Sequence, residues 1–222
     1  MNERRLRKPW YGIIGELFWG CSLTLFEVVN LGGFPWWWKL HWLMYRHYRG
    51  FDPDGRVRQL RGNNPGSLAY GETPVSATRR MLALAQVPVG STLVDLGCGR
   101  GLVAMAAACS GYRAVGVEVM PEYLEAAPAI TEALGIEVEW IIGDFLELEL
   151  PSGDCYFVAS TAFPQSVRDQ LGQRLAQGQA RLIITLDWII EHPDYEAVSS
   201  LRLPTTWGTS LFTVHRLRGT EP

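Results

Sequence analysis

The 222-residue sequence is poor in the residue types that build disulfide frameworks and metal sites. It contains four cysteines and four histidines, and no two of the cysteines stand in a CxxC pair. The histidines show no ligand spacing relative to the cysteines. We therefore expect neither a disulfide framework nor a metal site, and the low cysteine content predicts a reducing, cytoplasmic location.

The sequence also lacks an uninterrupted apolar run long enough to cross a bilayer. Residues 10–48 are strongly apolar and aromatic, but Glu16 and Glu27 leave only ten residues between them. A transmembrane helix needs about 20 apolar residues, so one here would be strained, and no secretory signal is evident. Two interpretations stay open. Trp, Tyr and basic residues favour the headgroup region, which predicts peripheral membrane contact; otherwise the segment is a helical arm packed on the domain or on a partner chain.

Neither sign of charge dominates, but the two signs are unevenly distributed. Residues 1–62 carry 10 Lys and Arg against 5 Asp and Glu, a net of +5, whereas residues 63–222 carry 10 against 18, a net of −8. The basic part also holds six of the nine tryptophans, so its cations are mixed with aromatic side chains. Because no dense basic patch results, nucleic-acid binding is not expected.

Composition divides the chain into three parts. Residues 1–50 form an apolar, Trp-rich N-terminal arm, and residues 51–69 are rich in Gly, Pro, Asn and Asp, which predicts a linker or lid. Over residues 70–222, apolar segments of strand length alternate with helical patterns. This alternation predicts a mainly parallel sheet with crossover helices.

Seven strands are predicted, at residues 91–96, 113–118, 137–142, 154–160, 181–186, 198–203 and 208–217. The first helix is expected to begin at Thr73-Pro74, with Thr as N-cap and Pro at the first helical position. The last two strands have no helix between them and should pair as an antiparallel ribbon. The predicted fold is therefore α/β: a Rossmann-like, seven-stranded, mostly parallel sheet with an antiparallel edge ribbon and a helical, aromatic-rich N-terminal arm.

The stretch 94-VDLGCGRGL-102 places three glycines, Gly97, Gly99 and Gly101, after a strand that contains Asp95. Ligands of such sheets bind at the carboxyl ends of strands, where glycine lets them approach the backbone. The dinucleotide pattern GxGxxG has its third glycine five residues after the first, whereas here it follows after four, which disfavours an NAD enzyme. Asp95 would repel a pyrophosphate and attract an ammonium or sulfonium group. The turn therefore predicts a site for S-adenosylmethionine, a cationic nucleoside without phosphate.

Two further acids follow predicted strands. Glu118 ends the second strand, where an acid can accept both ribose hydroxyls. Asp144 and Phe145 follow the third strand, where the carboxylate can take the adenine amino group and the ring can flank the base. The alternative for both acids is that they cap loops.

Together these motifs resemble the class I S-adenosylmethionine-dependent methyltransferases over residues 70–217. The segment 70-YGETP-74 is similar to a motif of the non-SET histone lysine methyltransferases named for disruption of telomeric silencing, in which it covers the methionine part of the cofactor. The resemblance implies that Tyr70 and Thr73 close over the cofactor. The predicted cofactor-binding residues are Tyr70, Thr73, Asp95, Gly97, Cys98, Gly99, Gly101, Glu118, Asp144 and Phe145.

The stretches 142-IGDFLE-147 and 157-FVASTAFPQSV-167 extend the likeness. At the methyl-transfer channel that family carries Asn-Asn-Phe-Ala-Phe, whereas this chain has Ala-Ser-Thr-Ala-Phe at residues 159–163. The paired amides are missing, so the family's acceptor cannot be carried over. The layout is also similar to small bacterial and mitochondrial lysine methyltransferases with an apolar N-terminal segment, and both resemblances imply methylation of a protein amine.

The predicted function is in-line methyl transfer from S-adenosylmethionine to a nucleophile, with a protein lysine amine as acceptor. The predicted catalytic residues are Ser160, Thr161, Phe163 and Glu72. The two hydroxyls would orient the amine or merely cap the helix at 164–177, Phe163 would line the channel, and Glu72 would act as a base or hold the lid. Two alternatives stay open: a methyltransferase for a small molecule or lipid at a membrane, and a non-catalytic S-adenosylmethionine-binding partner subunit. The predicted location is cytoplasmic, or peripheral at a membrane.

Overall fold

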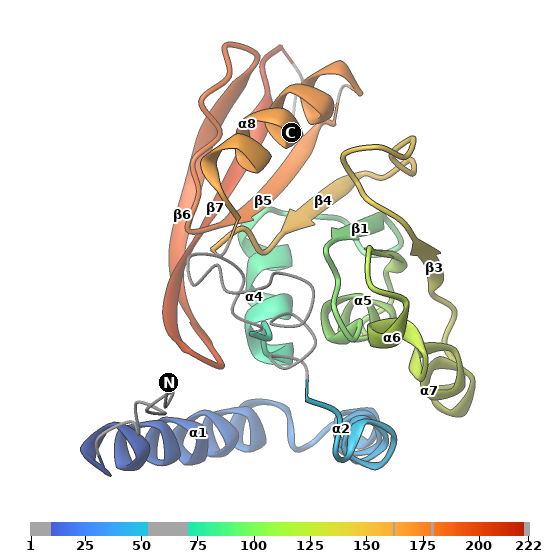
Figure 1. The fold of residues 1–222 in the computed structure, drawn as a ribbon, viewed down its shortest axis with the longest axis vertical. Coiled ribbons are helices and arrows are strands. Elements are labelled where there is room, and N and C mark those ends of the chain that lie inside the picture. Colours follow the sequence, from blue (N-terminus) through green and yellow to red (C-terminus); the bar gives the residue numbers. More distant parts are fainter. Residues whose placement is uncertain (1–9, 53–70, 162, 179, 220–222) are drawn as a thin grey trace, which may run out of the picture.

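A seven-stranded sheet with the strand order β3-β2-β1-β4-β5-β7-β6 forms the centre of the protein (Figure 1). The structure, a computed structural model, describes residues 10–52, 71–161, 163–178 and 180–219. The strands are β1 (Thr92–Leu96), β2 (Arg113–Glu118), β3 (Glu139–Ile142), β4 (Cys155–Val158), β5 (Leu182–Leu186), β6 (Tyr195–Thr205) and β7 (Gly208–Leu217). Strands β1 to β5 pair in parallel, and β7 pairs antiparallel with β5 and β6. The predicted mostly parallel sheet with an antiparallel edge ribbon is confirmed.

The central strands are buried on both faces, as their continuous apolar runs predict. In β1, Leu93, Val94 and Leu96 are completely buried. The edge strand β6 is instead largely exposed and extends beyond the predicted residues 198–203. Its length comes from pairing with β7, with an irregularity in register between Ala197 and Ser199.

Helices cover both faces of the sheet. The helices of the domain are α4 (Val75–Leu84), α5 (Leu102–Cys109), α6 (Pro121–Leu124), α7 (Ala127–Leu134) and α8 (Gln165–Gln177). One core joins α4 and α5 to one face of the sheet, and a second core joins α8 to the other face (Figure 1). The predicted single helix from Pro121 to Gly135 is two helices, because Pro128 has no N–H to continue the hydrogen bonds of α6.

The N-terminal arm consists of α1 (Trp10–Leu31) and α2 (Pro35–Tyr48), which form a layer beneath the domain (Figure 1). Leu40, Leu43 and Met44 of α2 are buried in one core with Met105 of α5 and Ile130 of α7. The arm is therefore packed on the domain, as the second interpretation of residues 10–48 predicts. None of the helices in the described part of the chain is both long and apolar enough to cross a membrane. Residues 53–69 of the predicted linker, and Tyr70, lie outside the described residues.

A buried carboxylate joins the arm to the start of α4. Glu27 of α1 accepts a hydrogen bond from the Ser76 N–H (2.7 Å) and another from Trp37 Nε1 of α2 (3.1 Å). Helix N-termini present unpaired N–H groups and a positive dipole, so a carboxylate stabilises them. The prediction that Thr73 caps this helix is wrong: α4 begins after Pro74 without a side-chain cap of its own, and the cap comes from α1.

Candidate active site

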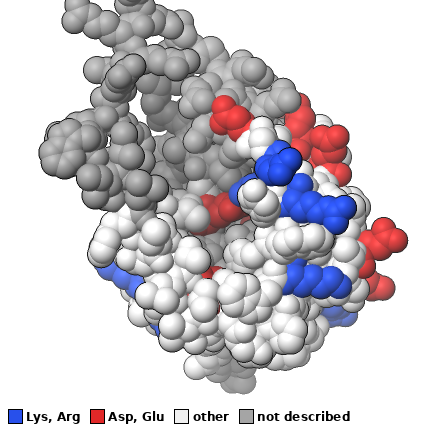
Figure 2. Space-filling model, turned by 90° about the horizontal axis from the view of Figure 1, so that it is seen from below, with Lys and Arg blue, Asp and Glu red and all other residues white. Residues whose placement is uncertain are grey.

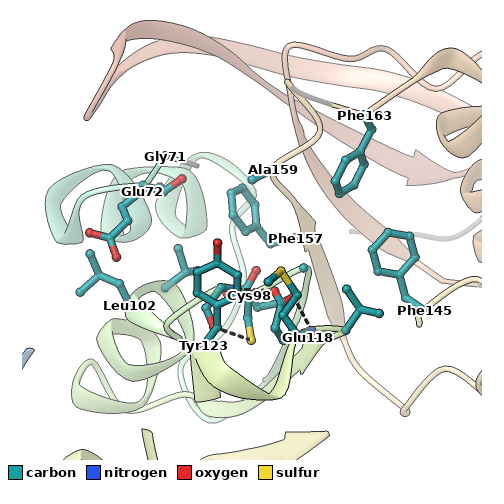
Figure 3. A pocket seen from close by; sticks show the side chains of 17 residues that line it. Gly71, Glu72, Cys98, Leu102, Glu118, Tyr123, Phe145, Phe157, Ala159 and Phe163 are labelled. Carbon is teal, nitrogen blue, oxygen red and sulfur yellow. Dashed lines mark hydrogen bonds between the residues drawn. The ribbon is translucent and has the colours of Figure 1, made fainter. Parts of the chain in front are cut away.

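A cavity of about 180 Å³ lies at the carboxyl ends of β1, β2 and β4 (Figure 3). The strand order reverses between β1 and β4, which is the place where sheets of this kind bind ligands. The lining residues come from five segments that are distant in sequence: Gly71, Glu72, Thr73, Asp95, Gly97, Cys98, Gly99, Leu102, Val103, Glu118, Val119, Met120, Tyr123, Phe145, Phe157, Ala159 and Phe163. Most of the predicted cofactor-binding residues are thus brought together in one place.

The glycine turn forms one wall of the cavity. Gly97 and Gly99 have φ angles of 79° and 54°, the left-handed region that favours glycine. The N–H groups of Gly97 and Cys98 both donate to the Val117 carbonyl, which fixes the turn against β2. A Cβ on Gly97 would lie 3.5 Å from the Phe163 ring, so the absent side chain keeps the space open.

The third glycine of the turn, Gly101, packs against an aromatic ring, and its contact with the cofactor stays a prediction. Gly101 lies outside the cavity lining, and a Cβ there would come within 2.3 Å of the Trp140 ring. Gly101 is the N-cap residue of α5 and has a φ of 80°. Packing therefore explains why glycine stands at position 101, since the Trp140 ring covers the backbone there and leaves no room for a side chain.

Asp95 is a buried carboxylate with an unsatisfied oxygen at the floor of the cavity. It exposes only 2% of its surface, and its Oδ2 atom has no hydrogen-bond partner among the described residues. Burial, with a smaller contribution from the negative charge of Glu118, raises the pKa of Asp95 to about 8. A buried, unpaired acid is costly, and a cationic ligand in the cavity would relieve that cost.

Glu118 is held at the end of β2 by two backbone groups. Its Oε2 atom accepts from the Gly99 N–H (2.8 Å) and its Oε1 atom from the Met120 N–H (3.0 Å). Burial raises the pKa of Glu118, although these N–H groups oppose the shift. Each oxygen has a second lone pair for a ligand hydroxyl, which agrees with the predicted position of the ribose.

Cys98 also faces the cavity but is not suited to be a nucleophile. Burial raises the pKa of its thiol well above the ordinary value, and the negative charges of Asp95 and Glu118 raise it further. The thiol therefore stays protonated at neutral pH, and the thiolate is the nucleophilic form. Cys98 is part of the wall.

The segment 71–73 covers one side of the cavity and is fixed from three directions. The Glu72 N–H donates to Thr206 Oγ1 (2.9 Å), and the Thr206 N–H donates to the Glu72 carbonyl (3.1 Å). Gly71 lies against the Trp207 ring, where a Cβ would approach within 2.1 Å. Glu72 Oε1 accepts from Nε (2.9 Å) and lies 2.8 Å from Nη2 of Arg100 in the glycine turn. This ion pair favours the lid-holding role of Glu72 over that of a base.

Aromatic rings form the wall opposite Glu72 (Figure 3). Phe145 and Phe163 lie with their ring centroids 5.6 Å apart, and both line the cavity. Asp144, the neighbour of Phe145, is exposed and does not line it. The Asp144 carboxylate accepts from the Leu146 N–H (2.8 Å), which corresponds to the loop-capping alternative, and its contact with adenine stays a prediction.

The two predicted catalytic hydroxyls are directed elsewhere. Ser160 is completely buried and donates to the Leu186 carbonyl (2.7 Å), while Thr161 is exposed and donates to Asp187 Oδ2 (3.2 Å). Neither lines the cavity, and neither caps α8, which begins after Pro164. The helix-cap alternative is therefore wrong, and the catalytic role of the two hydroxyls stays a prediction. Ala159 and Phe163, which flank them, do line the cavity.

Sequence reasoning missed a connection between the arm and the cavity. The Arg100 guanidinium lies 5.1 Å from the centre of the Tyr48 ring of α2. The Tyr48 hydroxyl donates to the carbonyl of Tyr123, a lining residue (2.5 Å). The partners lie 52 and 75 positions apart in sequence, so no local pattern could have revealed them.

Part of this chain is similar in sequence to known proteins. Residues 93–183 match the family model described as "Methyltransferase domain". A curated relative, Ribosomal protein L11 methyltransferase from Janthinobacterium sp. (strain Marseille), is 31% identical over 122 residues, which is 54% of this chain and 36% of that protein. Another, Protein-lysine N-methyltransferase from Saccharolobus islandicus (strain REY15A), is 35% identical over 87 residues, or 37% of this chain and 54% of that protein. The chain thus spans between a third and about half of the length of these relatives.

The fold has solved counterparts. The crystal structure of an RNA methyltransferase from Salinibacter ruber in complex with S-adenosyl-L-homocysteine superimposes with a TM-score of 0.57 at 24% identity, covering 68% of this chain and 96% of that one. The Rossmann-like architecture is therefore shared. Residues 93–183 thus match the methyltransferase-domain model, and the solved structure shares the Rossmann-like fold.

Proposed function

We propose that the chain is an S-adenosylmethionine-dependent methyltransferase that transfers a methyl group to a protein amine, with lysine as the acceptor side chain. The observation that carries the proposal is the unpartnered Oδ2 atom of buried Asp95, placed at the glycine turn beside Glu118. Among the described residues, neither Asp95 nor Glu118 forms an ion pair, so the two acids suit a positively charged ligand and disfavour a phosphate.

The described residues that line the cavity have the chemical groups that S-adenosylmethionine needs. The glycine turn lets a ligand lie against the backbone, Glu118 offers lone pairs to hydroxyl groups, and Phe145 offers a ring to a flat base. S-adenosylmethionine supplies a methyl group that is already activated on a sulfonium. The protein's contribution is therefore to align the acceptor and exclude water.

The aromatic wall suits an amine acceptor. A lysine ammonium must lose its proton before it can act as a nucleophile, and burial against apolar rings lowers the pKa of an amine. Phe157 and Phe163 line the cavity beside Ala159 and supply such surroundings. This arrangement needs no nucleophilic side chain, in keeping with the protonated Cys98 and the ion-paired Glu72.

The names of the two curated relatives support a protein acceptor, since one is a ribosomal protein methyltransferase and the other a protein-lysine methyltransferase. The solved counterpart is named as an RNA methyltransferase, but residues 63–222 of this chain carry a net charge of −8, from 10 basic against 18 acidic residues. A surface of that sign repels the phosphate backbone.

A tritiated-methyl transfer assay on a whole-cell lysate tests the proposal. Label is expected in the protein fraction and, after hydrolysis, in methyl-lysine. The Asp95→Asn variant should abolish transfer, whereas Asp169→Asn, an exposed carboxylate of α8, should not. Binding of S-adenosylmethionine without transfer to any fraction would instead identify a non-catalytic subunit.

One observation favours a second candidate, a methyltransferase for a small molecule or lipid at a membrane. The outer face of the arm exposes aromatic side chains, and Tyr48 of α2 contacts Arg100 of the glycine turn and the lining residue Tyr123. Label that partitions into the organic extract and is absent from protein would establish this function.

A further inference from the structure

The arm has an outer face of exposed apolar side chains. Among the residues that the structure describes, fourteen large hydrophobic side chains are exposed, and seven of these lie on the short arm. Six of them expose more than half of their surface: Phe18, Leu25, Val29, Trp38, Trp42 and Tyr45. Scattered exposed apolar residues are ordinary, but a concentrated set indicates a contact surface.

Helical spacing aligns these side chains in two stripes. On α1, Phe18, Leu25 and Val29 follow one another at seven and four residues; on α2, Trp38, Trp42 and Tyr45 follow at four and three. Such spacings place residues on one side of a helix. The opposite sides hold buried residues, Glu27 on α1 and Leu40 on α2, which face the domain. Because these buried residues pack on the domain, the exposed stripes face outward.

Positive charge accompanies the apolar stripes. Within residues 18–50 the only acid is Glu27, which is buried and used by α4, whereas Lys39, Arg46 and Arg49 are exposed on or beside α2. The Arg46 guanidinium lies 5.2 Å from the centre of the Trp42 ring. Seen from below, much of the described surface is uncharged, and both Lys and Arg and Asp and Glu side chains lie among the uncharged atoms (Figure 2). The segment that precedes α1 adds Arg4, Arg5, Arg7 and Lys8 against Glu3 in sequence.

Aromatic and apolar side chains mixed with cations, on helices that lie flat, match the composition of a lipid headgroup boundary. Between residues 18 and 50 the exposed charged side chains Lys39, Arg46 and Arg49 are all cations, which favours an anionic partner surface. We propose that the outer face of α1 and α2, centred on Leu25, Trp42 and Tyr45, docks on the surface of an anionic membrane. The two helices then lie parallel to that surface and hold the domain above it.

Vesicle flotation of the full chain tests this docking. Phosphatidylcholine vesicles are compared with vesicles of equal parts phosphatidylcholine and phosphatidylglycerol. The protein is expected to float with the anionic vesicles, with an affinity roughly tenfold or more above that for the neutral ones, and to be released by salt. Absence of flotation with both compositions would overturn the proposal.

Matched variants test whether vesicle binding depends on the outer face of α1 and α2. The triple variant Leu25→Ser, Trp42→Ser, Tyr45→Ser should lose about tenfold or more in vesicle affinity. The control triple variant Val89→Ser, Ile189→Ser, Leu201→Ser removes exposed apolar side chains elsewhere and should bind as the wild type does. Lys39→Gln with Arg46→Gln should weaken binding to anionic vesicles, whereas Arg181→Gln with Arg202→Gln should not.

Two measurements keep the result interpretable. Binding of S-adenosylmethionine by each variant reports whether the domain is folded, so loss of flotation with retained cofactor binding supports docking. Sedimentation equilibrium reports the oligomeric state. If the arm variant converts a dimer into a monomer and leaves vesicle binding unchanged, a second copy of the chain covers this face and the membrane proposal is wrong.

Discussion

The carboxylate of Glu27 in α1 lies 2.7 Å from the backbone nitrogen of Ser76 at the start of α4. This contact spans 49 residues of sequence and supplies the N-terminal cap that α4 lacks locally. The same carboxylate accepts from Trp37 Nε1, so one side chain connects both arm helices with the domain. The acid that interrupts the most apolar part of the sequence is thus a structural residue of the interface.

Replacement of Glu27 should destabilise the protein more than replacement of an exposed acid, because Glu27 is buried between the arm and α4. Glu27→Ala leaves two buried N–H groups without an acceptor, which predicts a loss of about 2–4 kcal/mol in the free energy of unfolding. Glu196→Ala, which removes an exposed ion pair with Arg218, should cost less than about 0.5 kcal/mol. Urea denaturation measures both, and equal effects would mean that the buried cap contributes little.

Deletion of residues 1–50 should prevent the domain from folding in a soluble form. Removal of α2 uncovers Met105 and Ile130, which are completely buried against the arm, and leaves the Ser76 N–H without its cap. Expression of residues 51–222, followed by size-exclusion chromatography, tests this. A monodisperse truncated protein with wild-type affinity for S-adenosylmethionine would show that the arm is an independent unit.

The sequence predicted the sheet and the floor of the cavity well because both are encoded locally. Apolar runs mark buried strands, and the alternation of Asp95, Gly97 and Gly99 lies within five residues. The contacts that the sequence did not predict join residues that only the fold brings together. The Ser160 hydroxyl is taken by the Leu186 carbonyl on the neighbouring strand β5, and Gly101 is required by Trp140 from β3. Arg100 and Glu72 look like unrelated charges until the glycine turn and segment 71–73 face each other.

Two glycines of the turn should respond differently to substitution. Gly99→Val adds a side chain to the cavity wall at a φ of 54° and should abolish S-adenosylmethionine binding in calorimetry. Gly101→Ala should instead act on folding, because its Cβ would collide with the Trp140 ring. We expect a fall in thermal stability for Gly101→Ala that Trp140→Leu in the same chain partly rescues. Unchanged binding in Gly99→Val would place the cofactor elsewhere.

Ionisation of Asp95 should couple cofactor binding to pH. Its pKa of about 8 in the free protein means that the acid is mostly protonated at pH 7, whereas a cation binds the ionised form. Affinity for S-adenosylmethionine should therefore rise by roughly tenfold between pH 7 and pH 9 and level off above the pKa.

The stability of the free protein should show the opposite trend with pH. The folded pKa lies above the unfolded value of 3.8, so this acid's contribution is complete below pH 4 and is lost as pH rises toward 8.

Calorimetry across this range, with Asp95→Asn as the comparison, checks the coupling, since the variant should bind weakly at every pH. S-adenosylhomocysteine is a sharper control because it keeps the amino group and lacks the sulfonium charge. If Asp95 faces the sulfonium, affinity for S-adenosylhomocysteine should vary little with pH. An equal pH dependence for both compounds would show that Asp95 faces the ammonium group, and pH-independent binding of both would remove Asp95 from cofactor recognition.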